Sequence, residues 1–264
     1  WVYWRESEPR NGGESCIAKP LQAADYADIL LGAGAYLIYM SAYPGFKRVF
    51  CESLGLDEGM VAWKELDSNF PVRNRPIYMG LIGSMSKRNF SETMPVMLKV
   101  LQKILDTHAS QKGLIHTATY KIGEAVYDYF MGTKHSKRLL FPQNADEREG
   151  CFTRHQASQN ASVLISPSMM EGFDFAENLA RWQAIVKIPF PYLGDRQVAA
   201  KKDQNQEWYD TETIKSVVQT TGRIVRSETD QGVTYILDAD FSILWDKYGK
   251  RLFPKWWTDA MVWE

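Results

Sequence analysis

The sequence predicts an α/β protein with a mainly parallel sheet that helices cover on both faces. From residue 89 onward, segments with helical periodicity alternate with short aliphatic segments typical of buried strands. Strands separated by helices form βαβ units, whose strands run parallel. Hydrophobic residues make up 45% of the 264 residues, which is ample for such a core. The sequence has no internal repeat and no low-complexity tract.

Charge and cysteine content exclude several classes of protein. A formal charge of −1 excludes a globally basic nucleic-acid-binding protein, although a local basic groove stays open. Cys16, Cys51 and Cys151 lie far apart, which argues against a disulfide scaffold, a zinc site or an iron–sulfur cluster in this chain. A reducing cytoplasm therefore fits best. No apolar run reaches transmembrane length, so we expect no membrane partner.

The first 88 residues are expected to form isolated elements followed by a connector. The N-terminal residues read like the middle of a strand, so we expect the chain to be a piece of a longer one. Asn11-Gly12-Gly13 is a good hairpin turn, and the stretch around Pro71 and Pro76 has no periodicity. The expected elements are strands at 1–9 and 14–19, a helix at 20–31, a strand buried on both faces at 35–42, a helix at 46–54 and a connector at 57–76 with at most one short strand.

Residues 89–264 carry the alternating pattern. The first helix has an apolar stripe from Met94 to Leu105, with apolar residues three and four apart. The expected helices are 91–108, 123–131, 145–158, 212–221 and a helical stretch from 243 to the tryptophan-rich end. The expected strands are 112–117, 137–141, 162–165, 183–188 and 234–237.

Loops beyond the carboxyl ends of parallel strands usually carry function. We therefore expect the site among the loops 41–45, 116–121, 166–175, 189–200 and 222–226. The segment 219–226 is the most distinctive, because guanidinium groups donate paired hydrogen bonds to phosphate and stay charged. If it is helical, Gln219, Arg223 and Arg226 share one face. The alternative is a surface helix with solvated arginines.

The other loops allow a functional and a structural interpretation each. Thr117 and Thr119 precede a helix and could bind phosphate or cap that helix. Ser41 follows an apolar run and could couple a bound nucleotide to a strand shift or cap the next helix. The loop with Ser166, Ser168, Glu171, Gly172 and Asp174 could approach a ligand closely or form only a turn. Phe190 and Tyr192 could stack on bases or belong to the core.

Taken together, these loops resemble the DinG/XPD-like branch of superfamily 2 DNA helicases, and specifically its second RecA-like motor domain. Gln-Thr-Thr-Gly-Arg-Ile-Val-Arg at 219–226 is similar to helicase motif VI, and residues 163–174 are similar to motif V. The Pro-Phe-Pro at 189–191 resembles the segment that follows motif V in this branch. Residues 114–118 occupy the place of motif IV. Met40-Ser41-Ala42-Tyr43 resembles motif III, with tyrosine where threonine is usual.

The resemblance implies a division of the chain and a set of roles. It implies that residues 1–56 are the end of a first motor domain, 57–88 a connector and 89–264 a RecA-like domain without a phosphate-binding loop. ATP with Mg²⁺ would bind between the two motor domains, with most ligands in the first. The roles implied are catalysis for Arg223, Arg226 and Gln219, nucleotide contact for Glu171, Gly172, Asp174 and Gly222, and DNA contact for Ser41, Thr117, Thr119, Ser166, Ser168, Phe190 and Tyr192.

The implied activity is 5′-to-3′ unwinding of DNA, with single-stranded DNA, the unwinding duplex and the first motor domain as partners. The branch includes repair helicases and CRISPR-associated DinG proteins, so a repair complex or a CRISPR ribonucleoprotein are both open as partners. No G-x-x-x-x-G-K-[ST] loop is present, so the chain alone is expected to be inactive. The alternatives are a non-catalytic single-strand-binding scaffold and an unrelated α/β enzyme acting on a nucleotide sugar.

Overall fold

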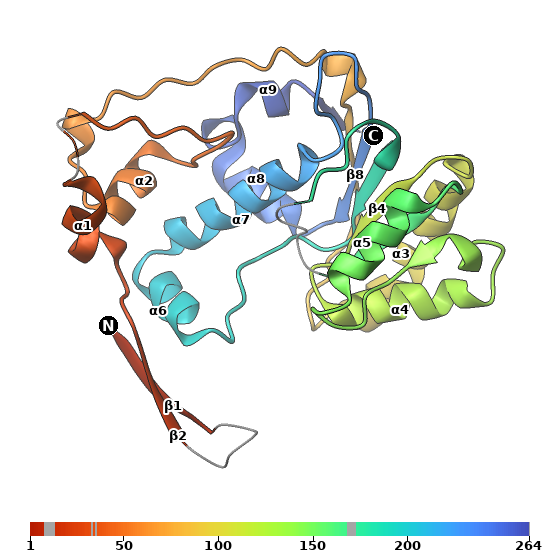
Figure 1. The fold of residues 1–264 in the computed structure, drawn as a ribbon, viewed down its shortest axis with the longest axis horizontal. Helices are drawn as coiled ribbons and strands as arrows, with labels where there is room; N and C mark the ends of the chain where they lie inside the picture. Colours follow the sequence, from red (N-terminus) through yellow and green to blue (C-terminus); the bar gives the residue numbers. More distant parts are fainter. Residues whose placement is uncertain (8–13, 33, 35, 168–172, 264) are drawn as a thin grey trace. The chain divides into compact units, whose positions relative to one another are not determined.

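A computed structural model describes residues 1–7, 14–32, 34, 36–167 and 173–263. These residues form two compact units (Figure 1). One unit comprises Trp1–Leu66 together with Phe190–Ser216, and the other comprises Asp67–Pro189 together with Val217–Glu264.

The second unit is built on a seven-stranded sheet, and neighbouring strands of its described residues pair in parallel. The strand order is β5-β6-β4-β7-β8-β3-β9. The strands are β3 (Ile77–Gly83), β4 (Gly113–His116), β5 (Leu139–Leu140), β6 (Val163–Ser166), β7 (Trp182–Ile185), β8 (Val233–Asp238) and β9 (Met261–Trp263). This arrangement confirms the mainly parallel α/β sheet expected from the sequence.

Helices cover both faces of this sheet because its central strands are apolar on both sides. Ile115 of β4 packs into a core with α3 (Phe90–Thr107) and α4 (Tyr120–Met131). Its neighbour Leu114 packs into a second core with residues of α5 (Arg148–Ala157). Successive strand residues point to opposite faces, so the two cores lie on opposite sides of the sheet. The other helices of this unit are α8 (Phe241–Tyr248) and α9 (Lys255–Thr258), together with the C-terminal end of α7 (Gln206–Thr221), whose first part belongs to the first unit.

Most of the elements expected in this unit are present with shifted ends. The apolar stripe of α3 is confirmed, because Met97, Leu101 and Leu105 are fully buried. Two strands were missed. β3 lies inside the stretch interpreted as a connector, and its Gly80 and Gly83 weaken the strand pattern. β9 lies at the end expected to be helical, where only three residues pair with the edge of the sheet.

The first unit contains a hairpin and short helices. β1 (Val2–Ser7) and β2 (Glu14–Lys19) pair antiparallel as expected, although the turn at residues 11–13 lies outside the described residues. The helices are α1 (Ala27–Leu31), α2 (Lys47–Leu54) and α6 (Arg196–Gln204).

Short 3-10 helices occur in both units. They span Ala23–Tyr26, Glu58–Met60, Val72–Asn74, Ser136–Arg138, Glu177–Leu179 and Gly249–Arg251. No described helix has the length and apolarity that crossing a membrane requires.

The prediction of a strand at residues 35–42 is wrong. Residue 35 lies outside the described residues, and residues 36–42 form no strand. Tyr36, Ile38 and Met40 are 95%, 88% and 91% exposed. A strand needs neighbours for its backbone N–H and C=O groups, and no described strand lies beside this segment.

Candidate functional site

The arginine loop, residues 222–232, connects α7 to β8. α7 ends at Thr221, so Gln219 lies in its last turn and both arginines lie beyond it. The three residues therefore do not share one helical face, and the prediction made for a helical segment does not apply to Gln219, Arg223 and Arg226. The chain leaves the helix because Ile224 and Val225 turn into the second core, where they are 0% and 4% exposed.

The two arginines meet the loop that follows β6. Nε of Arg226 lies 3.1 Å from Oδ1 of Asp174, and Nη1 of Arg223 donates to the carbonyl of Phe173 at 3.4 Å. The Arg226 and Asp174 side chains are 52% and 62% exposed, so their ion pair contributes at most about 1 kcal/mol. A phosphate could replace that carboxylate at little cost. Ser168, Glu171 and Gly172 lie outside the described residues.

Asp230 holds the backbone of the arginine loop, a role that the sequence alone did not assign to it. Its buried carboxylate accepts hydrogen bonds from the backbone N–H of Arg226 and of Glu177, both at 3.1 Å. It also accepts from the backbone N–H of Gln231 at 2.9 Å and from Nη1 of Arg181 at 2.8 Å. In the sequence, Asp230-x-Gly232 together with Leu237-Asp238 resembles the strand that follows motif VI in the helicase family, but this match gives Asp230 no role of its own.

The arginine loop does not lie beyond the carboxyl ends of the strands, so that expectation is wrong for residues 222–226. The loop leads into the amino end of β8, and its Asp230 binds Arg181, the residue before β7. A connection from a helix into a parallel strand necessarily arrives at the amino end. The loop after β6 also ends there, which explains why Asp174 and Arg226 meet.

The opposite edge of the sheet carries the hydroxyl residues. Thr117 Oγ1 is within hydrogen-bond distance of the carbonyls of Ser166 and Thr119, at 3.2 and 3.1 Å. Thr119 Oγ1 accepts from the backbone N–H of Ile122 at 3.3 Å, which makes it the N-cap of α4. Thr119 is exposed, whereas Thr117 and Ser166 are buried. The structure thus brings Thr117, Thr119 and Ser166 together.

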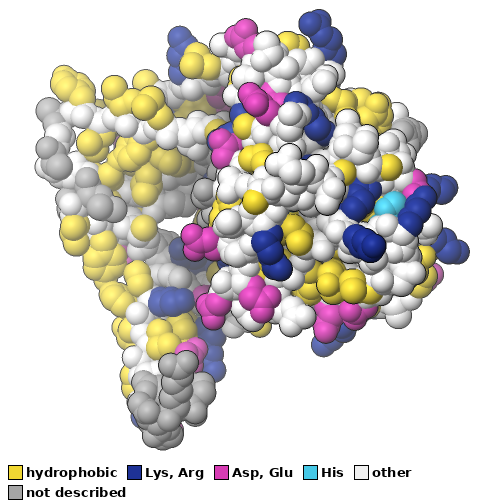
Figure 2. Space-filling view, turned by 45° about the vertical axis from the view of Figure 1, so that its right-hand side comes forward, with side chains coloured by type: hydrophobic (Ala, Val, Ile, Leu, Met, Phe, Trp, Pro, Cys, Tyr) yellow, Lys and Arg dark blue, Asp and Glu magenta, His cyan; other side chains and the backbone are white. Residues whose placement is uncertain are grey.

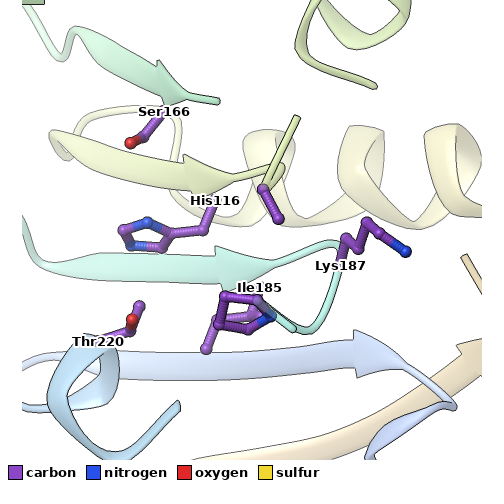
Figure 3. Close-up of a pocket in the computed structure, with 7 residues that line it drawn as sticks. His116, Ser166, Ile185, Lys187 and Thr220 are labelled. Carbon is purple, nitrogen blue, oxygen red and sulfur yellow. The ribbon is translucent and has the colours of Figure 1, made fainter. Parts of the chain in front are cut away.

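A small pocket lies beside these hydroxyls (Figure 3). Its cavity volume is about 10 Å³, room for about one water molecule. Lys187 lines it and donates from Nζ to the carbonyl of Met85 at 2.8 Å. The other lining residues are His116, Ala118, Ser166, Ile185, Pro189 and Thr220.

Asp238 is a second buried carboxylate, which the sequence matched to the helicase family only as the end of a strand. It lies at the carboxyl end of β8 and accepts from the backbone N–H groups of Met85, Ile188 and Asp240 at 3.0, 2.8 and 3.1 Å. Burial raises the pKa of Asp238 to about 6. The carboxylate therefore ties together the segments that follow β3, β7 and β8.

Three proposed DNA contacts lie in the first unit. Phe190 stacks on Tyr209, with ring centroids 6.1 Å apart, whereas Tyr192 is 79% exposed. Ser41 is exposed, and its Oγ accepts from the backbone N–H of Tyr43 at 3.3 Å. The capping interpretation of Ser41 is wrong, because Phe46 is the N-cap residue of α2.

Charge and metal-binding groups on the described surface are dispersed. On the face drawn in Figure 2, lysine and arginine side chains are interspersed with acidic and apolar ones and form no continuous basic stripe. Within the described ranges, no group of three or more His, Cys, Asp or Glu side chains is placed to hold a metal ion. On the face drawn in Figure 2, positive charge is therefore offered by individual side chains and not by a stripe.

Comparison with known proteins identifies the family. The helicase C-terminal domain family matches residues 101–260. The chain belongs to this family. Two solved structures titled XPD_Helicase and XPD_APO each share a TM-score of 0.67 with it, at 17% and 15% identity, and each covers 92% of the chain. The TM-scores show that the fold is RecA-like and of the XPD type. The matches span 45% and 52% of those structures.

Two of the three curated relatives described below are named as helicases. Regulator of telomere elongation helicase 1 homolog of Caenorhabditis briggsae is 21% identical over 252 residues, covering 79% of the chain and 25% of the relative. The homolog of Drosophila ananassae is 34% identical over 199 residues, covering 67% and 19%. Fanconi anemia group J protein homolog of Gallus gallus is 23% identical over 236 residues, covering 73% and 18%. The chain spans a quarter or less of each relative, and the resemblance to XPD-like helicases is confirmed.

Proposed function

We propose that this chain is the second motor domain of an ATP-dependent, 5′-to-3′ DNA helicase. In this proposal the arginine loop faces ATP and Mg²⁺ held mainly by a first motor domain. The observation that carries the proposal is the state of Arg226. Its backbone N–H is bound by the buried carboxylate of Asp230, while its guanidinium is half-exposed and paired with an exposed carboxylate. A cation on a fixed backbone with a replaceable partner suits a transient anionic ligand.

The proposed roles follow from the chemistry of phosphoryl transfer. Negative charge spreads over the γ-phosphate in the transition state, and an arginine placed there accelerates transfer by roughly 10³–10⁵. Arg226 and Arg223 supply that charge, and Gln219, one turn back on α7, orients the attacking water. Gly222 admits the nucleotide closely, and Glu171, Gly172 and Asp174 respond to its presence. Replacement of Asp174 by phosphate at Arg226 would release the loop after β6.

The exposure of residues 36–42 supports the proposal of a partner domain. Their alternate side chains Tyr36, Ile38 and Met40 are almost fully exposed, which is costly for an isolated chain. The segment fits as a strand in the sheet of a first motor domain, with its backbone paired on both edges. Ser41 at its end would then approach the DNA.

Single-stranded DNA is the proposed second ligand. Thr119 and the N-terminal amides of α4 would hold a phosphate, with Thr117 and Ser166 beside them. Ser168, outside the described residues, is a further proposed contact. Exposed Tyr192 offers a ring for stacking on a base, with Phe190 behind it on Tyr209. A repair complex and a CRISPR ribonucleoprotein are both candidate loading partners.

The deciding experiment uses a protein that joins this chain to its first motor domain. Arg226→Ala is expected to abolish DNA-stimulated ATP hydrolysis and to leave single-strand affinity nearly unchanged. Arg251→Ala, an exposed arginine outside the loop, is the matched control and keeps hydrolysis. The isolated chain is expected to hydrolyse no ATP. Hydrolysis retained by Arg226→Ala would favour the scaffold alternative, in which the domain only binds single strands.

A further inference from the structure

A buried chain of hydrogen bonds crosses the sheet from β4 to the start of the arginine loop. Gln183 of β7 is fully buried and donates from Nε2 to the carbonyl of Thr221 at 3.1 Å and to Oγ1 of Thr234 at 2.9 Å. Its Oε1 lies 3.0 Å from Nε2 of His116, the last residue of β4. Gln183 therefore links two strands to the last residue of α7.

The orientation of these groups is fixed by the carbonyl of Thr221. A carbonyl only accepts, so the amide NH₂ of Gln183 must face Thr221 and its oxygen must face His116. His116 consequently carries its proton on Nε2 and is neutral. Burial, with a smaller contribution from the nearby charge of Arg223, lowers the pKa of His116 to about 4. Figure 3 shows the His116 ring directed away from Lys187, toward the side where Thr220 lies.

Thr221 is held from a second direction as well. Nε1 of Trp257, in α9, donates to Oγ1 of Thr221 at 2.7 Å, and that hydroxyl donates to the carbonyl of Val218 at 2.8 Å. Both polar groups that Thr221 offers beyond its own N–H are thus bound inside the core. Thr221 immediately precedes Gly222 and Arg223, so the point at which the arginine loop leaves α7 is set by buried partners.

We propose that Gln183 is a positioning residue that, together with His116, sets the place of Arg223 relative to the end of β4. This inference rests on the role proposed above for Arg223. Because β4 leads directly into Thr117 and Thr119, the same chain joins the proposed phosphate seat for DNA to the proposed arginine finger. A displacement of about 1 Å at such a group costs up to about 10² in rate, so loss of this positioning is measurable.

The test is Gln183→Met, which keeps the side-chain length and removes the amide. In the protein joined to its first motor domain, kcat for ATP with saturating single-stranded DNA is expected to fall about tenfold, with KM for ATP changed less than about twofold. The matched control is His108→Leu. His108 is buried on the opposite face, with hydrogen bonds to Gln111 and Tyr235, and its loss lowers stability without lowering kcat.

A double variant separates positioning from general damage. In an Arg223→Ala background, Gln183→Met is expected to change kcat by less than about twofold, because it acts through Arg223. Equal fold-losses in both backgrounds, or a kcat loss no larger than that of His108→Leu, would overturn the inference alone. An undiminished kcat in Arg223→Ala itself would overturn the proposed function and this inference with it. If Gln183→Met does not fold, Trp257→Phe is the second variant. It removes one hydrogen-bond donor to Thr221 and should lower kcat about threefold. An unchanged kcat in Trp257→Phe would then overturn the inference.

Discussion

Replacement of Asp230 by alanine tests whether a buried carboxylate holds the arginine loop. The change removes the acceptor of three backbone N–H groups and of the Arg181 guanidinium. Breaking a fully buried ion pair costs about 3–5 kcal/mol, and the Arg181 side chain is 23% exposed, so water recovers part of that cost. We expect a loss of about 3 kcal/mol in the free energy of unfolding. For a domain of this size that lowers Tm by roughly 6–12 °C.

The assay is urea and thermal unfolding of the chain, beside a matched surface carboxylate. Asp259 pairs with Lys255 at the surface, where both side chains are well exposed, so Asp259→Ala should cost less than about 1 kcal/mol. The same Asp230→Ala change should lower ATP hydrolysis when a first motor domain is present, because Arg226 loses its backbone anchor. Equal stability losses for the two variants would refute the account of the loop given above.

Three further predictions concern pH, a glycine and the exposed apolar segment. Burial raises the pKa of Asp238 from 3.8 to about 6, so the folded chain binds this proton more tightly than the unfolded chain and loses stability as pH rises between those values. The free energy of unfolding relative to Asp238→Asn should fall by about 2 kcal/mol from pH 4 to pH 6 in urea titrations, and parallel pH profiles would contradict this. Gly222→Ala should keep Tm, because an added Cβ would lie 3.7 Å from its nearest neighbours, yet lower ATP hydrolysis. Gly113→Ala, with a Cβ 2.1 Å from Trp182, should unfold the chain, and a Tm loss in Gly222→Ala would show a structural role. Ile38→Asp should change the free energy of unfolding by less than about 0.5 kcal/mol, because the side chain is 88% exposed. The same variant should weaken the pull-down of a first motor domain. An intact pull-down would argue against the proposed strand.

The sequence was sufficient to predict the elements that are buried along their whole length. β4, β6 and β7 are aliphatic runs, and α3 has an apolar residue every third or fourth position, so local pattern and burial agree. Residues 36–42 have the same pattern but no neighbouring strands among the described residues. Burial of a strand depends on what lies beside it, and a local pattern does not contain that information. β3 was missed for the opposite reason, because its neighbours β8 and β9 stabilise a weak local pattern.

The candidate site was only partly accessible to sequence reasoning. Arg226 and Asp174 were identified from separate segments, and their contact depends on the crossing of the loop after β6 to the amino edge of the sheet. Asp230 was matched only as part of the strand that follows motif VI, and Gln183 only as the start of a strand, because a single sequence does not show which polar residues are buried. Their importance appears only when the donors and acceptors around them are counted.

The distribution of buried polar groups favours a motor domain over a passive scaffold. Burying Asp230 and Arg181 costs desolvation energy, and well-packed apolar residues in their place would often be equally or more stabilising. A scaffold that only bound single strands would gain nothing from that cost at the amino edge, because the hydroxyls proposed to contact DNA lie at the carboxyl edge. Asp230 and Gln183 instead direct their hydrogen bonds to the residues that carry or precede the two arginines. Two cations held at the edge opposite the proposed DNA seat are what the proposed nucleotide, as a second ligand, would require.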